Sequence, residues 1–149
     1  MYVNIDFIHN KWCNKIMENN YRYTNTTVSF INYHFVFCPR YRRKIFLIQG
    51  VEKRLKELTQ IKCKELKIEI IAIECDKDYV HMFLNCPPTL SPSDIMQKLK
   101  GYTSKILREE FFELCKMPSL WTRSYFVSTA GNVCSETIKK YVENQKKRY

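Results

Sequence analysis

Two short apolar runs separated by a polar turn constrain the fold of this chain most. Residues 68–75 (IEIIAIEC) are rich in β-branched side chains, and residues 79–86 (YVHMFLNC) follow after Asp76-Lys77-Asp78. Apolar, β-branched runs on either side of a tight turn predict an antiparallel β-hairpin. We therefore expect an antiparallel sheet in the middle of the chain.

Further strands are predicted at residues 27–37 (TVSFINYHFVF) and 120–128 (LWTRSYFVS). Apolar residues recur at helical spacing from about residue 51 to 66 and from about 94 to 114, with Ser91 or Ser93 as N-cap of the second helix. A last helix is predicted from about residue 135 to 147. The first six elements follow the split βαβ order of an α+β, ferredoxin-like antiparallel sheet, with strands 27–37 and 79–86 adjacent at its centre. The last helix is an addition to that fold.

The length of the chain indicates one domain. Its 149 residues are 45% hydrophobic, enough for a single core. The Asn-rich stretch 1–24 shows no sustained periodicity and is predicted to be a loose N-terminal extension, with residues 25–149 forming the domain. Met17 offers a second plausible start within that stretch.

The charge balance predicts a polyanionic partner. There are 25 Lys and Arg against 15 Asp and Glu, a net charge of +10. Nucleic acid is the first expectation and anionic membrane the second. No apolar run approaches the ~20 residues of a membrane span, and the N-terminus does not resemble a signal peptide. The seven cysteines are odd in number and form no CxxC pair, which favours reduced thiols in a cytoplasmic protein.

His81, Tyr141 and Gln145 are candidates for chemistry. Strand alternation places Tyr79 and His81 on the same face, and a neutral imidazole is the commonest metal ligand, although a buried core histidine is the plainer interpretation. Tyr141 and Gln145 lie four residues apart on the last predicted helix and so share a face. A tyrosine hydroxyl can attack phosphorus, and an amide oxygen can reach a divalent cation. The alternative is that Tyr141 belongs to the buried stripe of an amphipathic helix.

Basic and aromatic residues form two candidate nucleic-acid surfaces. Phosphate contacts by such residues would make affinity salt-sensitive, and Tyr41, Trp121 and Tyr125 could stack on unpaired bases. The alternative is an ordinary solvated charged surface. No GxxxxGK[ST] motif is present, so no nucleotide cofactor is expected. The predicted DNA-binding residues are Arg40, Arg42, Arg43, Lys44, Trp121, Arg123, Lys139 and Lys140.

Four stretches together resemble a known family. They are YHFVFCPRYRRK (33–44), DYVH (78–81), LWTRSYFVSTAG (120–131) and ETIKKYVENQ (136–145). In order and spacing they resemble the insertion-sequence-200-like transposases, single-tyrosine enzymes that move single-stranded DNA. The resemblance covers about four-fifths of the chain.

The resemblance implies a fold and a chemistry. Members are ferredoxin-like homodimers of the His-hydrophobe-His type, in which the tyrosine helix of one subunit can complete the site of the other. They cleave and rejoin single-stranded DNA at hairpin-bearing element ends, without ATP, through a 5′-phosphotyrosine. By position, Tyr141 is the nucleophile, and His81 and Gln145 are ligands of Mg²⁺ or Mn²⁺.

One position departs from the family pattern. The first motif histidine is Tyr79 in this chain, and a phenol with a pKa of ~10 is a poor neutral ligand. Two interpretations stay open. In one, Tyr79 ligates weakly as phenolate, or a water takes its place. In the other, the protein is catalytically impaired and acts only by binding hairpin single-stranded DNA or RNA.

Overall fold

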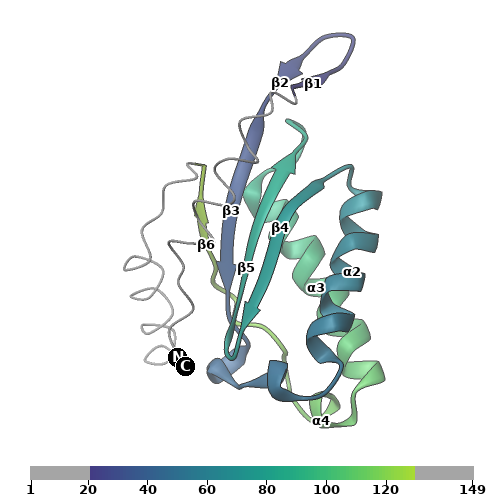
Figure 1. The fold of residues 1–149 in the computed structure, drawn as a ribbon, viewed down its shortest axis with the longest axis vertical. Coiled ribbons are helices and arrows are strands. Elements are labelled where there is room, and N and C mark those ends of the chain that lie inside the picture. The colour runs from purple at the N-terminus through teal and green to yellow at the C-terminus, as the bar shows by residue number, and fades with distance from the viewer. Residues whose placement is uncertain (1–20, 130–149) are drawn as a thin grey trace.

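The computed structural model describes residues 21–129, so the predicted helix at 135–147, with Tyr141, Gln145, Lys139 and Lys140, lies outside the described residues. A four-stranded antiparallel sheet is built from β3 (Ile31–Phe37), β4 (Glu69–Asp76), β5 (Tyr79–Cys86) and β6 (Phe126–Ser128) (Figure 1). Its order is β4-β5-β3-β6, so β3 and β5 are the central strands. This is the predicted split βαβ arrangement, and the predicted central pairing is confirmed.

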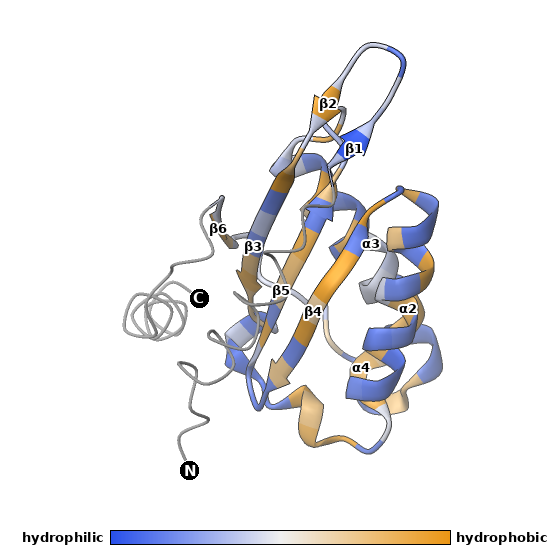
Figure 2. Cartoon of the chain, turned by 45° about the horizontal axis from the view of Figure 1, so that its top comes forward, coloured by the Kyte–Doolittle hydropathy of each residue, from blue (hydrophilic) through white to orange (hydrophobic). Residues whose placement is uncertain are grey.

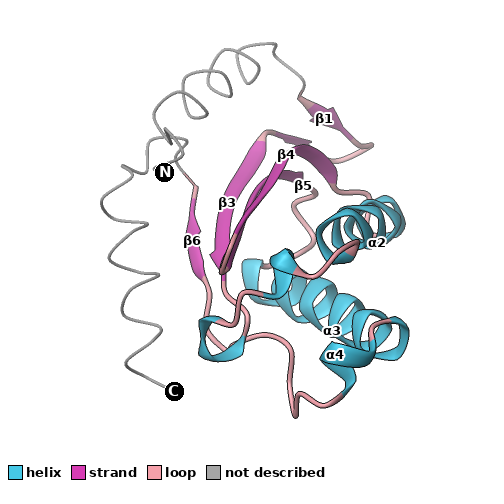
Figure 3. Cartoon of the chain, turned by 60° about the horizontal axis from the view of Figure 1, so that its bottom comes forward, coloured by secondary structure: helices cyan, strands magenta, loops and turns pink. Residues whose placement is uncertain are grey.

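Two helices cover one face of this sheet (Figure 3). Helix α2 (Val51–Glu65) connects β3 to β4, and α3 (Pro92–Glu110) connects β5 to β6. The apolar stripes of both helices pack with the inward side chains of β3 and β5 in one core, and the Arg54 guanidinium ties the helices together through a bidentate ion pair with Glu110. Figure 2 shows hydrophobic residues along the strands and polar residues on the outer surface of the helices.

The ends of the helices follow local capping chemistry. Ser91 is the N-cap of α3: its hydroxyl accepts from the Asp94 amide, and the Asp94 carboxylate accepts from the Ser91 amide. The helix was expected to continue to residue 114, but it ends at Glu110 because Phe111 is extended (φ −112°, ψ 115°). A separate turn of helix, α4 (Phe112–Cys115), follows.

The last predicted strand is much shorter than expected. Of residues 120–128, three form β6, whereas Trp121 makes an isolated bridge to Pro39. The carbonyls of Arg123 and Ser124 accept hydrogen bonds from the Lys100 ammonium instead of joining the ladder. The irregular segment is thus held by a side chain of α3.

Short elements complete the described chain. A two-stranded ribbon, β1 (Arg22–Tyr23) and β2 (Val28–Ser29), projects from the start of β3 (Figure 1). It straddles the predicted domain start at residue 25. The 3₁₀ turns η1 (Arg40–Arg42) and η2 (Ile45–Leu47) lead from β3 into α2. No helix among residues 21–129 is long and apolar enough to cross a membrane.

Candidate active site

The candidate site lies on the sheet face that points away from α2 and α3. We call it the histidine face, because it carries His34 and His81. Alternation along β5 sends Val80, Met82 and Leu84 into the helix-side core. Tyr79 instead packs against Val36 and Cys38 on the histidine face. The predicted division of this strand into two faces is therefore confirmed, and His81 lies on the side opposite the helices.

His81 has a histidine neighbour that the sequence did not reveal. Val36 is the cross-strand partner of His81, and His34 is the partner of Phe83, so His34 and His81 are diagonal neighbours on one face. Their ring centroids are 4.0 Å apart at 31°, and the Nε2 atoms of the two rings meet. His34 is 2% exposed and His81 8%. The two central strands thus place two buried imidazole rings side by side, with their Nε2 atoms in contact.

Two aromatic rings lie beside His34. The Phe83 ring lies 5.8 Å from its ring centroid, and the edge-on Phe126 ring lies 6.3 Å away. Phe83 and Phe126 come from different strands, β5 and β6. The histidine pair therefore lies beside aromatic side chains of two neighbouring strands in the sheet.

Tyr79, at the position of the first motif histidine, is a protonated phenol. Burial, followed by the Asp76 carboxylate, which also accepts a hydrogen bond from the phenol, raises the pKa of Tyr79 to about 12. The charges of Asp78 and Cys38 act in the same direction. The phenolate ligand considered from the sequence is thus disfavoured at neutral pH, because burial and, after it, the Asp76 carboxylate keep the pKa of Tyr79 high.

The donor chemistry of the histidine face can be tested against a divalent cation. Two imidazole Nε2 atoms suit Mn²⁺ and the later transition metals, whereas the protonated Tyr79 does not. Residues 21–129 contain no cluster of three or more His, Cys, Asp or Glu side chains arranged as a complete metal site. The residues therefore fit two protein ligands, with the predicted Gln145 outside the described chain.

The basic cluster after β3 divides into bound and exposed residues. Arg42 pairs with Asp78 at 2.6 Å, with its side chain 23% exposed. Arg40 donates to the Ser119 hydroxyl at 2.8 Å. Arg43 and Lys44 are exposed, as is Arg123. Arg43, Lys44 and Arg123 are consequently the described members of the predicted DNA-binding set that are presented to solvent.

Two non-glycine residues of this cluster have positive φ angles. Tyr41 (φ 60°) and Arg42 (φ 51°) both lie in the left-handed region. The Arg42–Asp78 ion pair joins this turn to the β4–β5 hairpin. The Tyr41 ring is 46% exposed, with the Arg40 guanidinium 5.3 Å from its centroid.

The structure argues against the stacking role predicted for Trp121. Its side chain is 5% exposed and packs edge-on against Phe37, with ring centroids 5.0 Å apart. The indole N–H donates to the Thr103 hydroxyl at 3.0 Å. The ring is therefore part of the core, and its sequence position in an expected strand gave no sign of that.

The described cysteines are thiols. Cys38, Cys63, Cys75, Cys86 and Cys115 form no disulfide. Burial raises the pKa of four of these thiols to about 12, namely Cys38, Cys63, Cys75 and Cys86. They behave as small core residues, and Cys38 on the histidine face is a weak metal ligand in its protonated state.

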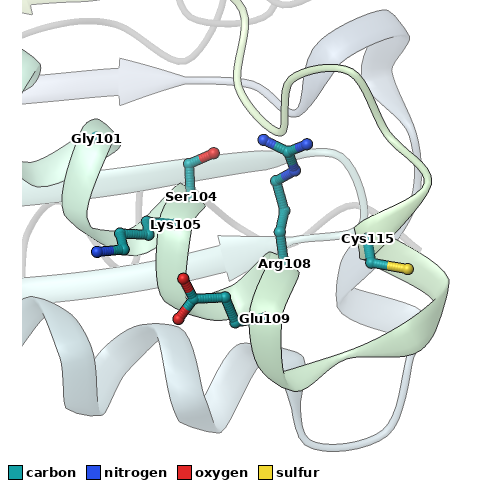
Figure 4. Close-up of a pocket in the computed structure, with 6 residues that line it drawn as sticks. All are labelled: Gly101, Ser104, Lys105, Arg108, Glu109 and Cys115. Atoms are coloured by element: carbon teal, nitrogen blue, oxygen red, sulfur yellow. The ribbon is translucent and has the colours of Figure 1, made fainter.

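A hollow of about 420 Å³ lies on the helix layer, away from the histidines (Figure 4). It is lined by Gly101, Ser104, Lys105, Arg108 and Glu109 of α3 and by Cys115 of α4. Two cations and one carboxylate give it a mixed lining. Because it is on the opposite side of the sheet, it is separate from the candidate site.

Comparison with known proteins gives a consistent family. The model of the family described as "Transposase IS200 like" matches residues 27–145. The transposase for insertion sequence element IS200 of Salmonella typhimurium is 35% identical over 117 residues, 76% of this chain and 75% of its own length. The ISDra2 transposase TnpA of Deinococcus radiodurans is 27% identical over 118 residues, 77% and 84% of the two chains.

Solved structures agree on the fold. A candidate transposase from Deinococcus radiodurans R1 superposes with a TM-score of 0.72 at 28% identity, covering 83% of this chain and 97% of that one. A REP-associated tyrosine transposase bound to a REP hairpin superposes with a TM-score of 0.52 at 15% identity, covering 82% and 68%. At that identity the second likeness concerns the fold alone.

Proposed function

Because the chain belongs to the IS200-like transposase family, we propose that it cleaves and rejoins single-stranded DNA at the ends of a transposable element. The family match continues through residue 145 and so includes Tyr141 and Gln145. The observation that carries the proposal is His81, buried on the histidine face of the central strand within that matched range.

Tyr141 is the proposed nucleophile. Its phenol oxygen attacks a backbone phosphorus, the bond to the 3′ oxygen breaks, and the phenol proton passes to that leaving oxygen. The products are a 5′-phosphotyrosine and a free 3′-hydroxyl. Attack by a 3′-hydroxyl on the phosphotyrosine reverses the chemistry and joins strands without a nucleotide, because the ester keeps the bond energy.

His81 and Gln145 are the proposed ligands for Mg²⁺ or Mn²⁺, which would polarise the phosphate when bound. His81 is held in place by its strand and by His34. Tyr79 contributes a protonated phenol, because burial and the Asp76 carboxylate raise its pKa to about 12. We expect the phenol to face the site as a hydrogen-bonding group rather than as a charged ligand.

Hairpin DNA is the proposed substrate, and a homodimer the proposed active form. A solved tyrosine transposase of similar fold is bound to a REP hairpin, and we extend that substrate class to this chain by analogy of fold. Arg43, Lys44 and Arg123 are exposed and can contact phosphates, and Lys139 and Lys140 are proposed to do the same. The homodimer is proposed from the family resemblance, which implies that the tyrosine helix of one subunit can complete the site of the other.

The test is a covalent protein–DNA adduct on a denaturing gel. Purified protein is incubated with labelled single-stranded DNA from its element ends and Mn²⁺. The proposal expects a shifted band that Tyr141→Phe abolishes while hairpin binding is kept. Tyr41→Phe is the matched control, because Tyr41 is an exposed tyrosine in the basic cluster. An adduct that survives Tyr141→Phe would refute the nucleophile.

The second candidate function is binding without cleavage. The protonated state of Tyr79 favours it, because the first motif ligand is lost. In that case no adduct forms, salt-sensitive hairpin binding is kept, and Tyr79→His restores the adduct. The same gel therefore separates the two candidate functions.

A further inference from the structure

We propose that His34 replaces the missing first motif histidine, so that His34 of β3 and His81 of β5 form a two-imidazole metal site across the two central strands. The inference rests on the proposed function for its biological use, but its test is metal binding, which can be measured without DNA. It assigns a metal-binding role to a residue that lies outside the His-hydrophobe-His motif.

Strand register creates the pair. In the family motif the two histidines are two residues apart on one strand, and position 79 here is occupied by tyrosine. His34 reaches the same face from the neighbouring strand, because it pairs with Phe83 and is therefore diagonal to His81. Diagonal neighbours on one face of an antiparallel pair are within reach of ring side chains.

The rings turn nitrogen edges, rather than carbon edges, toward each other. The two Nε2 atoms meet, with ring planes tilted by 31°. Two neutral rings can share one proton at that point, or both can direct a lone pair to one cation. Two imidazolium ions could not stay in contact, because like charges this close repel strongly.

Two negatively charged carboxylates of β4 lie on the same face as the histidine pair. Glu74 is the cross-strand partner of His81 on β4, so its exposed carboxylate stands on the histidine face. Asp76, two residues further along the same strand, accepts the Tyr79 hydrogen bond. Both carboxylates lower the cost of a divalent cation near the imidazoles, and Glu74 is the closer strand neighbour of His81.

The chemical class of the ligand follows from the donors. Imidazole binds Mn²⁺ more weakly than Co²⁺, Ni²⁺ or Zn²⁺, and Mg²⁺ prefers oxygen. We therefore expect affinity to rise in the order Mg²⁺, Mn²⁺, Co²⁺, Zn²⁺. An order with Mg²⁺ above Mn²⁺ would contradict an imidazole pair, because it would indicate an all-oxygen site.

The test is calorimetric titration of the full-length protein with Mn²⁺ and Co²⁺. His34→Gln is expected to weaken binding at least about tenfold, since even outer-shell changes cost about 10- to 100-fold. Tyr33→Phe is the matched control, because Tyr33 is on the same strand but packs with the helix-side core. Unchanged affinity in folded His34→Gln overturns the proposal.

A second measurement protects against misfolding of the variant. In the unmutated protein with ¹⁵N-labelled histidines, diamagnetic Zn²⁺ is expected to shift the Nε2 signals of both His34 and His81 at the same concentration, because coordination changes the chemical shift of the ligating nitrogen itself. A shift of the His81 Nε2 signal with the His34 Nε2 signal unchanged overturns the proposal even if no variant folds.

The two proposals fail separately. If His34→Gln loses metal affinity and no adduct ever forms, the His34 assignment stands and the cleavage proposal fails. If the adduct forms with Mn²⁺ and His34→Gln keeps normal metal affinity, the cleavage proposal stands and the His34 assignment fails.

Discussion

Replacing Tyr79 by histidine is the perturbation with the most informative outcome. With a pKa of about 12, the phenol is almost wholly protonated at about pH 7.5, so presenting a phenolate would cost on the order of 6 kcal/mol. An imidazole with an ordinary pKa of about 6.5 is mostly neutral at that pH and carries no such cost. Its second ring N–H could donate to Asp76, as metal-bound histidines commonly donate to carboxylates.

We therefore expect Tyr79→His to tighten Mn²⁺ binding at least about tenfold, or about 1.4 kcal/mol, and to raise the yield of the DNA adduct. The assay is Mn²⁺ calorimetry followed by the adduct gel at limiting Mn²⁺. Tyr79→Phe is the matched control, because it keeps the ring and removes the hydroxyl. It should leave Mn²⁺ affinity unchanged. A loss of affinity in Tyr79→Phe would show that the phenol is a ligand and would refute the reasoning.

The remaining predictions concern the surface, the core and pH. Arg43→Ala with Lys44→Ala should weaken hairpin binding and reduce the salt slope by about 2, since each residue is exposed and can neutralise one phosphate; an unchanged slope returns both to an ordinary solvated surface. Trp121→Phe should lower the free energy of unfolding by about 1–3 kcal/mol, because the Thr103 hydroxyl loses its indole donor, and should leave hairpin affinity unaltered; weaker binding without a stability change would restore Trp121 as a base contact. Stability should fall as pH rises from about 9 to 12, since the unfolded chain releases thiol protons that the folded state keeps. Lys100 has the opposite effect on the free energy of unfolding. Its pKa is lowered to about 8 in the folded protein, so the unfolded chain binds the proton better between pH 8 and 10.5. The four thiols outweigh this single ammonium group. Chemical denaturation under reducing conditions at several pH values checks this, and constant stability up to pH 11 would contradict it. The thiols concerned are Cys38, Cys63, Cys75 and Cys86.

The sheet was predictable because its signals are local. The turn at Asp76-Lys77-Asp78 fixes the β4–β5 hairpin, and alternation along 79–86 assigns each side chain to a face. The order of elements then leaves few topologies, of which the split βαβ form is the one observed. Helix ends were less predictable, since the extended backbone at Phe111 depends on its packing rather than on its identity.

His34 was missed for a physical reason. Its own strand, TVSFINYHFVF, shows that it lies among apolar residues, but the register between 31–37 and 80–86 decides which residue of β5 it meets. Register depends on tertiary packing, and a slip of one residue would have placed His34 on the helix side. The sequence predicts that these two strands are adjacent. Knowing a single cross-strand residue pair in addition would have set the register and placed His34 beside His81.

Trp121 was misplaced for a related reason. The stretch 120–128 has strand composition throughout, yet the Leu120 carbonyl and Thr122 amide bond to the chain around Pro39, past the end of β3. The indole then turns into the core to reach Thr103. Composition alone does not show where a strand leaves the sheet.

The most direct test of the central claim is to identify the linkage in the adduct. Single-stranded element-end DNA is labelled separately on either side of the cleavage point, and the adduct is digested and analysed by mass spectrometry. The account predicts that the protein keeps the label of the 5′-phosphate fragment, and that the modified peptide carries it on Tyr141. A linkage to the 3′ fragment, or to another residue, would contradict it.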